Sequence, residues 1–269
     1  MKSHSKPCEG LSWQFTHAIA RLPAASIVRG LRAEDRGAPD LETYLAEHSA
    51  YLETLRNCGV ETVLLGPLEA YPDSVFVEDA ALCLPEGFIV LRPGAASRRG
   101  EADEMAADFD RHGYTYRRID RGGIDGGDIL VTDRVVMVGK SARTDNAGFS
   151  NLEELLAGWG YAARLVDTPA DVLHLTSDCA ILDSGTVLST RRLAQSGCFE
   201  DFCVLEVPAG EEASANCIRV NGYVLVPGGY PATAELLDSA GYRVMTVPAG
   251  QAALLDGGLS CQSLRFRLA

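Results

Sequence analysis

Residues 223–248 read YVLVPGGYPATAELLDSAGYRVMTVP and contain the unit from which the chain is built. The apolar run over 223–227 predicts a short strand, and the Gly-Gly pair after it favours a turn. Residues 231–240 have the pattern of an amphipathic helix, and Gly241 suits a left-handed helix cap. A second apolar run over 242–248 predicts another strand. The stretch therefore predicts a small β-unit covered by one helix.

The same order of elements recurs along the chain. Three further units have predicted helices over 41–56, 101–111 and 151–159. The apolar runs before and after these helices lie at 17–23 and 58–67, at 88–93 and 113–116, and at 135–139 and 160–166. A degenerate copy has its two runs at 186–190 and 203–208. Five repeated α/β units form either a stack or a closed ring. A stack needs capping repeats, none of which is obvious, so we predict a ring in one domain spanning 1–269. Residues at corresponding strand ends then meet at its centre.

Composition narrows the class of ligand. The 269 residues include 37 acidic and 24 basic side chains, a formal charge of −13. A field of that sign disfavours nucleic acids and anionic membrane surfaces and is compatible with a cationic small molecule. We find no apolar run long enough to span a membrane and no apolar signal-peptide core, so we expect a cytoplasmic protein. A homodimer is compatible with the sequence, which does not set the oligomeric state.

The eight cysteines form no C-x-x-C pair, and we expect free thiols that are mostly small buried hydrophobes. Cys261 differs in its setting, because two glycines precede it in DGGLSCQS (256–263) and a strand-like alternation follows it. His174 lies between leucines in a strand-like segment. A Cys-His pair is a candidate nucleophile and acid-base, although a buried thiol and a structural histidine explain the same residues.

Charged residues cluster in four loops. Asp125 and Asp128 flank a Gly-Gly turn, which suits either a turn or a functional site. Glu78 and Asp79 run directly into an apolar strand, and buried paired carboxylates favour a bound cation.

Two arginines, Arg98 and Arg143, follow strands at the same point of consecutive units and can clamp a carboxylate. Together with the carboxylates, they describe a site for a small zwitterion with a distal cation, as in an arginine-like amino acid.

Eight segments in order resemble those of the dimethylarginine dimethylaminohydrolases, a family of the guanidino-group-modifying (pentein) superfamily. They are THAIARLP (16–23), DSVFVED (73–79), RPGAASRRGE (92–101), DGGDIL (125–130), RTDN (143–146), LHLTS (173–177), ANCI (215–218) and DGGLSCQS (256–263). The resemblance implies a pentein fold, a five-bladed α/β propeller of ββαβ-like units.

The resemblance also implies roles for ten residues. Cys261 is the nucleophile, His174 the acid and then the base, and Asp125 the group that orients His174. Substrate contacts fall to Glu78 and Asp79 for the guanidinium, Asp73 for the amino end, Arg98 and Arg143 for the carboxylate, Leu31 on a mobile lid, and Leu255. Methylated arginine is hydrolysed through an S-alkylthiouronium to citrulline and the amine. The reaction needs a thiolate, which a cationic substrate favours, and no metal or cofactor.

Departures from family patterns bear on the substrate. Where the family often has R-T-N, this chain has Arg143-Thr-Asp, and the family's L-T-C is Leu259-Ser-Cys in this chain. Arginine deiminases carry H-x-D where this chain has His174-Leu-Thr, and they are much longer. These features favour an N-methylated arginine. The alternatives are a hydrolase of another guanidino compound, such as arginine or agmatine, and a non-catalytic ring that binds a small molecule or partner.

Overall fold

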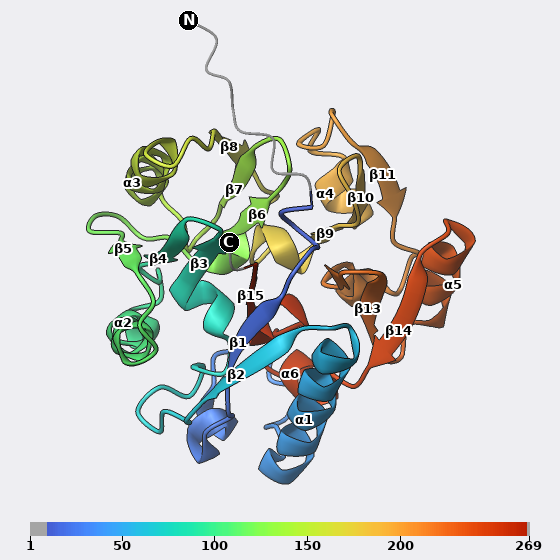
Figure 1. Ribbon diagram of the computed structural model, residues 1–269. Helices are drawn as coiled ribbons and strands as arrows, with labels where there is room; N and C mark the ends of the chain where they lie inside the picture. The colour runs from blue at the N-terminus through green and yellow to red at the C-terminus, as the bar shows by residue number, and fades with distance from the viewer. Residues whose placement is uncertain (1–9, 268–269) are drawn as a thin grey trace, which may run out of the picture.

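The computed structural model describes residues 10–267 and consists of small three-stranded sheets with helices outside them (Figure 1). Four sheets are each formed by three consecutive strands: β3 (Ala81–Leu84), β4 (Gly87–Val90) and β5 (Tyr116–Arg118); β6 (Ile129–Val131), β7 (Val136–Lys140) and β8 (Ala163–Asp167); β9 (Cys179–Ile181), β10 (Thr186–Ser189) and β11 (Cys203–Glu206); and β12 (Ile218–Val220), β13 (Tyr223–Pro227) and β14 (Arg243–Val247). The fifth sheet is formed by β15 (Leu264–Phe266), β1 (His17–Arg21) and β2 (Glu61–Leu65).

All five sheets share one connection. The middle strand pairs antiparallel with the first strand and parallel with the third. A helix joins the middle strand to the third, as a parallel pair requires. These helices are α1 (Leu41–Asn57), α2 (Glu101–Arg111), α3 (Asn146–Ala157), α4 (Arg191–Ala194) and α5 (Pro231–Ser239). The prediction of repeated α/β units is therefore confirmed, and the degenerate copy is the unit whose helix has a single turn.

The first and last strands of the described chain lie in the same sheet. β15 pairs antiparallel with β1, with Ile19 opposite Leu264. The unit that contains the first predicted helix is thus completed by the C-terminal strand. Figure 1 shows the five sheets arranged around a common centre, with β15 near the middle of the view.

Five apolar clusters each join two neighbouring sheets. Phe88 and Phe266 belong to the cluster between the β3–β5 sheet and the β15–β2 sheet, and Leu225 belongs to the cluster between β12–β14 and β1. The other three link β3–β5 to β6–β8, β6–β8 to β9–β11, and β9–β11 to β12–β14. Burying these side chains from water holds each sheet against the next.

Local sequence explains several helix boundaries. The side chains of Asp40, Asp145 and Thr190 accept hydrogen bonds from backbone N–H groups in the first turns of α1, α3 and α4. The prediction that the third helix begins at residue 151 was wrong, because the Asp145 cap starts α3 at Asn146. Gly241, after α5, has φ 91°, the left-handed conformation expected for a helix cap.

A single-turn 3-10 helix precedes the first strand of every sheet. These turns are η2 (Val77–Ala80), η4 (Gly126–Asp128), η5 (Leu175–Ser177), η6 (Glu212–Ala215) and η7 (Ser260–Gln262). Three further short elements are η1 (Ala25–Arg29), η3 (Ala96–Arg98) and α6 (Gly250–Ala253). His174 caps η5 and is not in a strand, so the strand-like interpretation of that segment was wrong.

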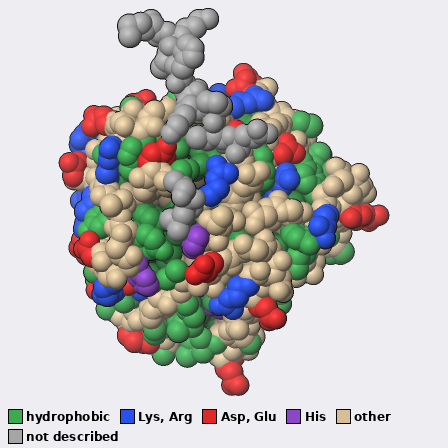
Figure 2. Space-filling model, viewed as in Figure 1, with side chains coloured by type: hydrophobic (Ala, Val, Ile, Leu, Met, Phe, Trp, Pro, Cys, Tyr) green, Lys and Arg blue, Asp and Glu red, His purple; other side chains and the backbone are tan. Residues whose placement is uncertain are grey.

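On the face in Figure 2, basic and acidic side chains are interspersed over the coloured surface. Among residues 10–267, no helix has the length and apolar character needed to cross a bilayer. The seven cysteines of that range are free thiols, as expected, and Cys8 lies outside the described residues.

Candidate active site

The 3-10 turns bring the predicted chemistry to one place. Asp79 lies in η2, Asp125 caps η4, His174 caps η5, and Cys261 lies in η7. These turns precede four different sheets, and residues far apart in the sequence meet around one cavity. The expectation that functional residues come from corresponding strand ends agrees with this placement.

A cavity of about 170 Å³, here called the front cavity, collects nine of the ten predicted residues. Cys261, His174 and Asp125 line it, and all three are buried. The other six that line it are Leu31, Asp73, Asp79, Arg98, Arg143 and Leu255. Glu78 is the predicted residue that does not.

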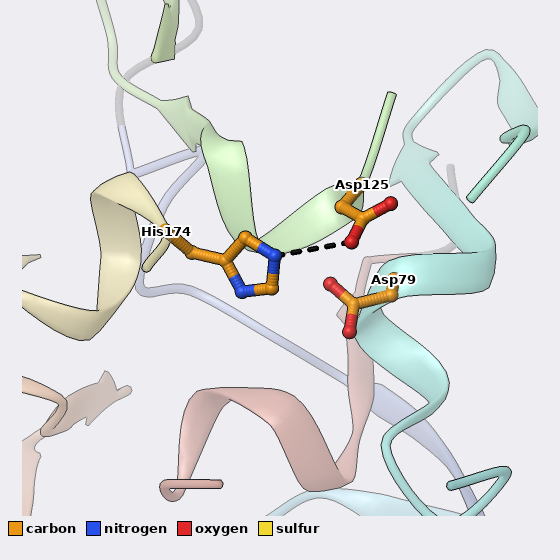
Figure 3. A group of neighbouring side chains, drawn as sticks. All are labelled: Asp79, Asp125 and His174. Atoms are coloured by element: carbon orange, nitrogen blue, oxygen red, sulfur yellow. Dashed lines mark hydrogen bonds and ion pairs between the residues drawn. The ribbon is translucent and has the colours of Figure 1, made fainter. Parts of the chain in front are cut away.

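His174 is held between two carboxylates (Figure 3). Its Nε2 lies 3.0 Å from Asp125 Oδ2, and the Asp79 carboxylate points toward the same ring. Burial disfavours a charged imidazole, but the charge of Asp79, the bond to Asp125 and the charge of Asp128 outweigh it. Together they raise the pKa of His174 to about 9. The imidazole is therefore protonated at neutral pH and can give a proton to a departing amine.

The same three side chains are the group in the described chain with donor atoms close enough to share a metal ion. One donor atom of each of Asp79, Asp125 and His174 lies within 4.8 Å of the others. The Asp79 oxygens already accept bonds from Arg98 Nη1 and from the Gly127 N–H at 3.0 Å. The expectation that no metal is needed stays a prediction.

Cys261 lies in a buried environment with weak polar contacts. Its Sγ is 3.5 Å from the Gly258 nitrogen, 3.8 Å from Asn216 Nδ2 and 3.8 Å from Ser260 Oγ. Burial and the nearby charges of Glu78 and Asp79 raise the pKa of the thiol to about 12, against the opposing effect of the contacts that Gly258 and Ser260 make with the sulfur. The thiol is therefore neutral at neutral pH.

Asn216 is a site residue that the sequence reasoning missed. Its Oδ1 accepts the Ser260 N–H at 2.9 Å, which directs its Nδ2 toward the Cys261 sulfur. Asn216 follows η6, so the turn before the β12–β14 sheet also contributes to the centre. The available signal was its place in ANCI (215–218), directly before a strand, at the same point of the unit as the other site residues.

The Glu78 side chain points away from the front cavity, which the neighbouring Asp79 lines. Its Oε2 accepts a hydrogen bond from Ser260 Oγ at 2.7 Å, and its Oε1 is 3.8 Å from Arg265 Nη2. It lines a second cavity of about 130 Å³, here called the rear cavity. Consecutive residues of a tight turn point in different directions, so the expectation that Glu78 and Asp79 share the guanidinium finds no support in this placement.

The two predicted carboxylate-binding arginines have different surroundings. Arg98 is 5% exposed and donates to the Glu101 carboxylate, to Asp79 and to the carbonyls of Asp73 and Phe76. The Arg143 side chain is half-buried and, within the described chain, has no hydrogen bond or ion pair. Arg143 therefore presents the guanidinium that is free to bind a carboxylate, whereas Arg98 is mostly used within the protein.

The rim is formed by the segment around Leu31. The Leu31 N–H donates to Asp73 Oδ1 at 2.8 Å, and the Ala33 N–H donates to Asp256 Oδ2 at 2.6 Å. The Leu31 side chain is 40% exposed, whereas Leu255 is buried in the cavity wall. These two backbone bonds hold the segment against the cavity, and the expectation that it is a mobile lid stays a prediction.

Known proteins share this sequence and fold. A family model described as "N,N dimethylarginine dimethylhydrolase, eukaryotic" matches residues 35–182. The N(G),N(G)-dimethylarginine dimethylaminohydrolase of Pseudomonas aeruginosa is 40% identical over 94% of this chain and 100% of its own length. The protein of that name from Streptomyces coelicolor is 34% identical over 93% of this chain and 96% of its own length.

A solved structure agrees with these matches. The Pseudomonas aeruginosa protein, a cysteine-to-serine mutant in complex with citrulline, has a TM-score of 0.90 and 39% identity, covering 94% of this chain and 100% of its own. The family model matches more than half of the chain, and the relatives match nearly all of it. This chain belongs to the dimethylarginine dimethylaminohydrolase family.

Proposed function

We propose that this protein hydrolyses Nω-methylated L-arginine, as asymmetric dimethylarginine or monomethylarginine, to L-citrulline and dimethylamine or methylamine. The observation that carries the proposal is the front cavity, where a buried thiol, a protonated histidine and a carboxylate meet. The relatives at 40% and 34% identity are named for this activity. The relative of known structure is bound to citrulline, the proposed product.

Each end of the substrate has a complementary group in the front cavity. Arg143 takes the α-carboxylate, with Arg98 behind it, because a guanidinium can bind a carboxylate through two hydrogen bonds. Asp73 takes the amino group, while Leu31 and Leu255 cover the aliphatic part. Asp79 takes the guanidinium beside the Cys261 sulfur. The opposite charges at the two ends fix the direction in which the substrate binds.

The reaction uses Cys261 as nucleophile and His174 as acid and then base. The Cys261 thiolate attacks the guanidinium carbon, and the His174 imidazolium protonates the departing amine to leave a covalent S-alkylthiouronium. The neutral imidazole then removes a proton from water, which attacks the same carbon to give a tetrahedral intermediate. The hydroxyl of this intermediate loses its proton to solvent as the C–S bond breaks, and citrulline and the thiolate are released. Asp125 keeps the ring oriented through both steps by its bond to Nε2.

The cationic substrate is part of how the thiol ionises. Burial and two carboxylates keep the thiol neutral in the free protein. A guanidinium bound to Asp79 offsets that negative charge next to the sulfur, so the pKa of the thiol falls on binding. The nucleophile then forms where a cation is present, which favours guanidino substrates over neutral amides.

Two alternatives remain to be separated from this function. A hydrolase of arginine or agmatine would use the same Cys261 and His174, and a non-catalytic ring would bind a small molecule without turnover. Agmatine has no carboxylate for Arg143, and Thr176 stands where the deiminases have a second guanidinium-binding carboxylate. Both features favour a methylated amino acid.

One assay compares the candidates. The protein is incubated separately with asymmetric dimethylarginine, monomethylarginine, arginine and agmatine, while citrulline and the released amine are measured. We expect citrulline and a methylamine from the first two. Turnover of arginine or agmatine alone contradicts the proposal, and turnover of none supports the non-catalytic alternative.

The finer description of the fold is also proposed. The apolar clusters between neighbouring sheets and the pairing of β15 with β1 support a closed five-bladed propeller in one domain. A cytoplasmic location and a homodimer stay predictions.

A further inference from the structure

A thin wall separates the front cavity from the rear cavity. Ser260 lines the rear cavity and its neighbour Cys261 lines the front one, and Glu78 and Asp79 divide in the same way. The two cavities are therefore connected through side chains of adjacent residues in η2 and η7. A proton can cross such a wall along hydrogen-bonded groups without any movement of the backbone.

Of the groups that residues 10–267 place around the Cys261 sulfur, one can accept its proton. The Gly258 nitrogen and Asn216 Nδ2 are N–H donors without a free lone pair, and the Asn216 amide is held in that orientation by the Ser260 N–H. The Ser260 hydroxyl, 3.8 Å from Sγ, both accepts and donates. Chemistry alone selects Ser260 as the contact through which the thiol proton can leave within the protein.

Ser260 in turn has an acceptor for its own proton. Its Oγ donates to Glu78 Oε2 at 2.7 Å, within the range of a strong hydrogen bond to a carboxylate. Burial raises the pKa of Glu78, against the lowering effect of Arg265, so this carboxylate is more basic than an exposed one. Sulfur, hydroxyl and carboxylate thus form a continuous chain across the wall.

His174 is not available for this proton. It is already protonated at neutral pH, and its Nε2 is committed to Asp125. Within the described chain His174 makes no hydrogen bond to Cys261. The proton on His174 is needed for the departing amine, so the thiol proton requires a separate acceptor.

We propose that the Cys261 thiol proton passes through the Ser260 hydroxyl to Glu78, and that Glu78 releases it to water in the rear cavity. The inference rests on the proposed function, in which a thiolate attacks a bound guanidinium. The S–H bond breaks as Ser260 Oγ gains that proton, and the original Ser260 O–H bond breaks as Glu78 Oε2 gains the other. The electron pair of the S–H bond stays on sulfur.

Charge balance supports this route. The transfer itself moves one negative charge from Glu78 to Cys261 and leaves the total charge of the wall unchanged. Release of the proton from Glu78 to water then restores the Glu78 charge, and the bound guanidinium offsets the charge that Cys261 has gained. The charge moves toward the front cavity, where the substrate cation lies. The rear cavity, of about 130 Å³, is large enough to hold water beside Glu78.

The test compares two alkylating probes on Glu78→Gln. Iodoacetamide is uncharged, whereas chloroacetamidine carries an amidinium that binds beside Asp79 and covers the sulfur. Removing the Glu78 charge lowers the pKa of the thiol, so alkylation of Cys261 by iodoacetamide rises by about threefold or more. Alkylation by chloroacetamidine falls by about tenfold or more, because the enclosed thiol has lost its proton acceptor. The rates are read by mass spectrometry of the Cys261 peptide.

Variants of Ser260 test the same route independently. Ser260→Ala interrupts the chain and slows alkylation by chloroacetamidine by about tenfold, and Ser260→Thr, which keeps the hydroxyl, stays within about threefold of the unaltered protein. Adding Glu78→Gln to Ser260→Ala gives no further loss, because both act on one transfer. Ser214→Ala is the matched control: it removes a buried hydroxyl in η6 that bonds Thr233 and the Glu211 carbonyl.

The opposite movement of the two rates is what separates the relay from simpler roles. If both alkylation rates rise in Glu78→Gln, the only effect of Glu78 is to repel the thiolate. If both rates fall, Glu78 has a structural role. Either of these results, or no change in either rate, overturns the relay. Failure of chloroacetamidine to modify Cys261 in the unaltered protein overturns it too. The probes do not require hydrolysis, so a protein that releases no citrulline refutes the proposed function while these rates still decide on the relay.

Discussion

Asp125 and His174 come from the turns of two neighbouring sheets, and a hydrogen bond of 3.0 Å joins the Asp125 carboxylate to His174 Nε2. This bond fixes the ring, and with Asp79 it keeps the imidazole charged against the cost of burial. A histidine that stays protonated to about pH 9 suits a reaction whose leaving group is an amine. The pairing links the packing of two sheets to the proposed chemistry.

The first prediction concerns pH and activity. Because the imidazolium must donate its proton, activity falls as pH rises through about 9, the pKa of His174. Asp125→Asn removes a carboxylate that raises this pKa, so the basic limb moves to lower pH and activity drops by about 100-fold. Initial rates of citrulline formation across pH check both. An unchanged basic limb in Asp125→Asn contradicts the assignment.

The same shift predicts a change in stability with pH. The folded pKa of His174 is raised from 6.5 to about 9, so its stabilising contribution is complete below pH 6.5 and is lost as pH rises through about 9. The contribution is on the order of 3 kcal/mol. Urea unfolding of the protein and of His174→Gln measures it. The difference in free energy of unfolding should shrink between pH 6.5 and about pH 10, and a constant difference contradicts the shift.

The two arginines predict different phenotypes. Arg143→Ala removes a guanidinium that has no hydrogen bond or ion pair within residues 10–267. We expect KM for dimethylarginine to rise by about tenfold or more while stability changes by less than about 0.5 kcal/mol. Arg98→Lys breaks bonds to buried Asp79 and Glu101 and costs about 3 kcal/mol or more of stability. Steady-state kinetics and thermal unfolding separate the two. A severe loss of stability in Arg143→Ala would contradict its free placement.

Substitutions at the adjacent glycines Gly126 and Gly127 are expected to differ, one lowering stability and the other lowering kcat. A Cβ at Gly127 would lie 2.7 Å from His174 Nδ1, so Gly127→Ala displaces the imidazole and lowers kcat by about 100-fold. A Cβ at Gly126 would lie 1.8 Å from the Glu78 backbone oxygen, which cannot move alone, so Gly126→Ala destabilises the fold by about 3 kcal/mol. Unfolding curves with kinetics test the pair. Equal effects on stability would contradict it.

Asn216 provides a further prediction. Asn216→Ala removes the amide that faces the sulfur and the acceptor for the Ser260 N–H, so it costs about 1–3 kcal/mol of stability and lowers kcat. Asn216→Asp keeps the acceptor but adds a negative charge, which raises the pKa of the thiol and slows alkylation of Cys261. Alkylation across pH distinguishes them. Faster alkylation of Asn216→Asp at neutral pH would contradict the contact.

Much of the fold could be predicted because each unit repeats one hydrophobic pattern. The helix over 101–111 was predicted with its observed bounds, whereas α3 begins five residues before 151. Its start depends on the Asp145 cap and not on an apolar stripe. Strand periodicity also suggested a strand at His174, where backbone hydrogen bonds form a 3-10 turn instead.

The sequence predicted which residues form the site, but not the directions in which their side chains point. Nine residues meet in one cavity, but Glu78 and Asp79 diverge because they occupy one short turn. That divergence depends on backbone geometry that a sequence motif does not carry. Asn216 was missed because its contacts are to neighbours in η7, which only the tertiary structure brings close.

The covalent step is tested most directly by mass spectrometry of the Cys261 peptide during turnover. The protein is mixed with asymmetric dimethylarginine, quenched in acid within a turnover and digested, with Cys261→Ser as the control. We predict a transient added mass equal to the substrate minus dimethylamine on Cys261, and neither adduct nor citrulline from the variant. Citrulline formation by a folded Cys261→Ser protein, or turnover with no adduct on Cys261 at any time, would contradict the account.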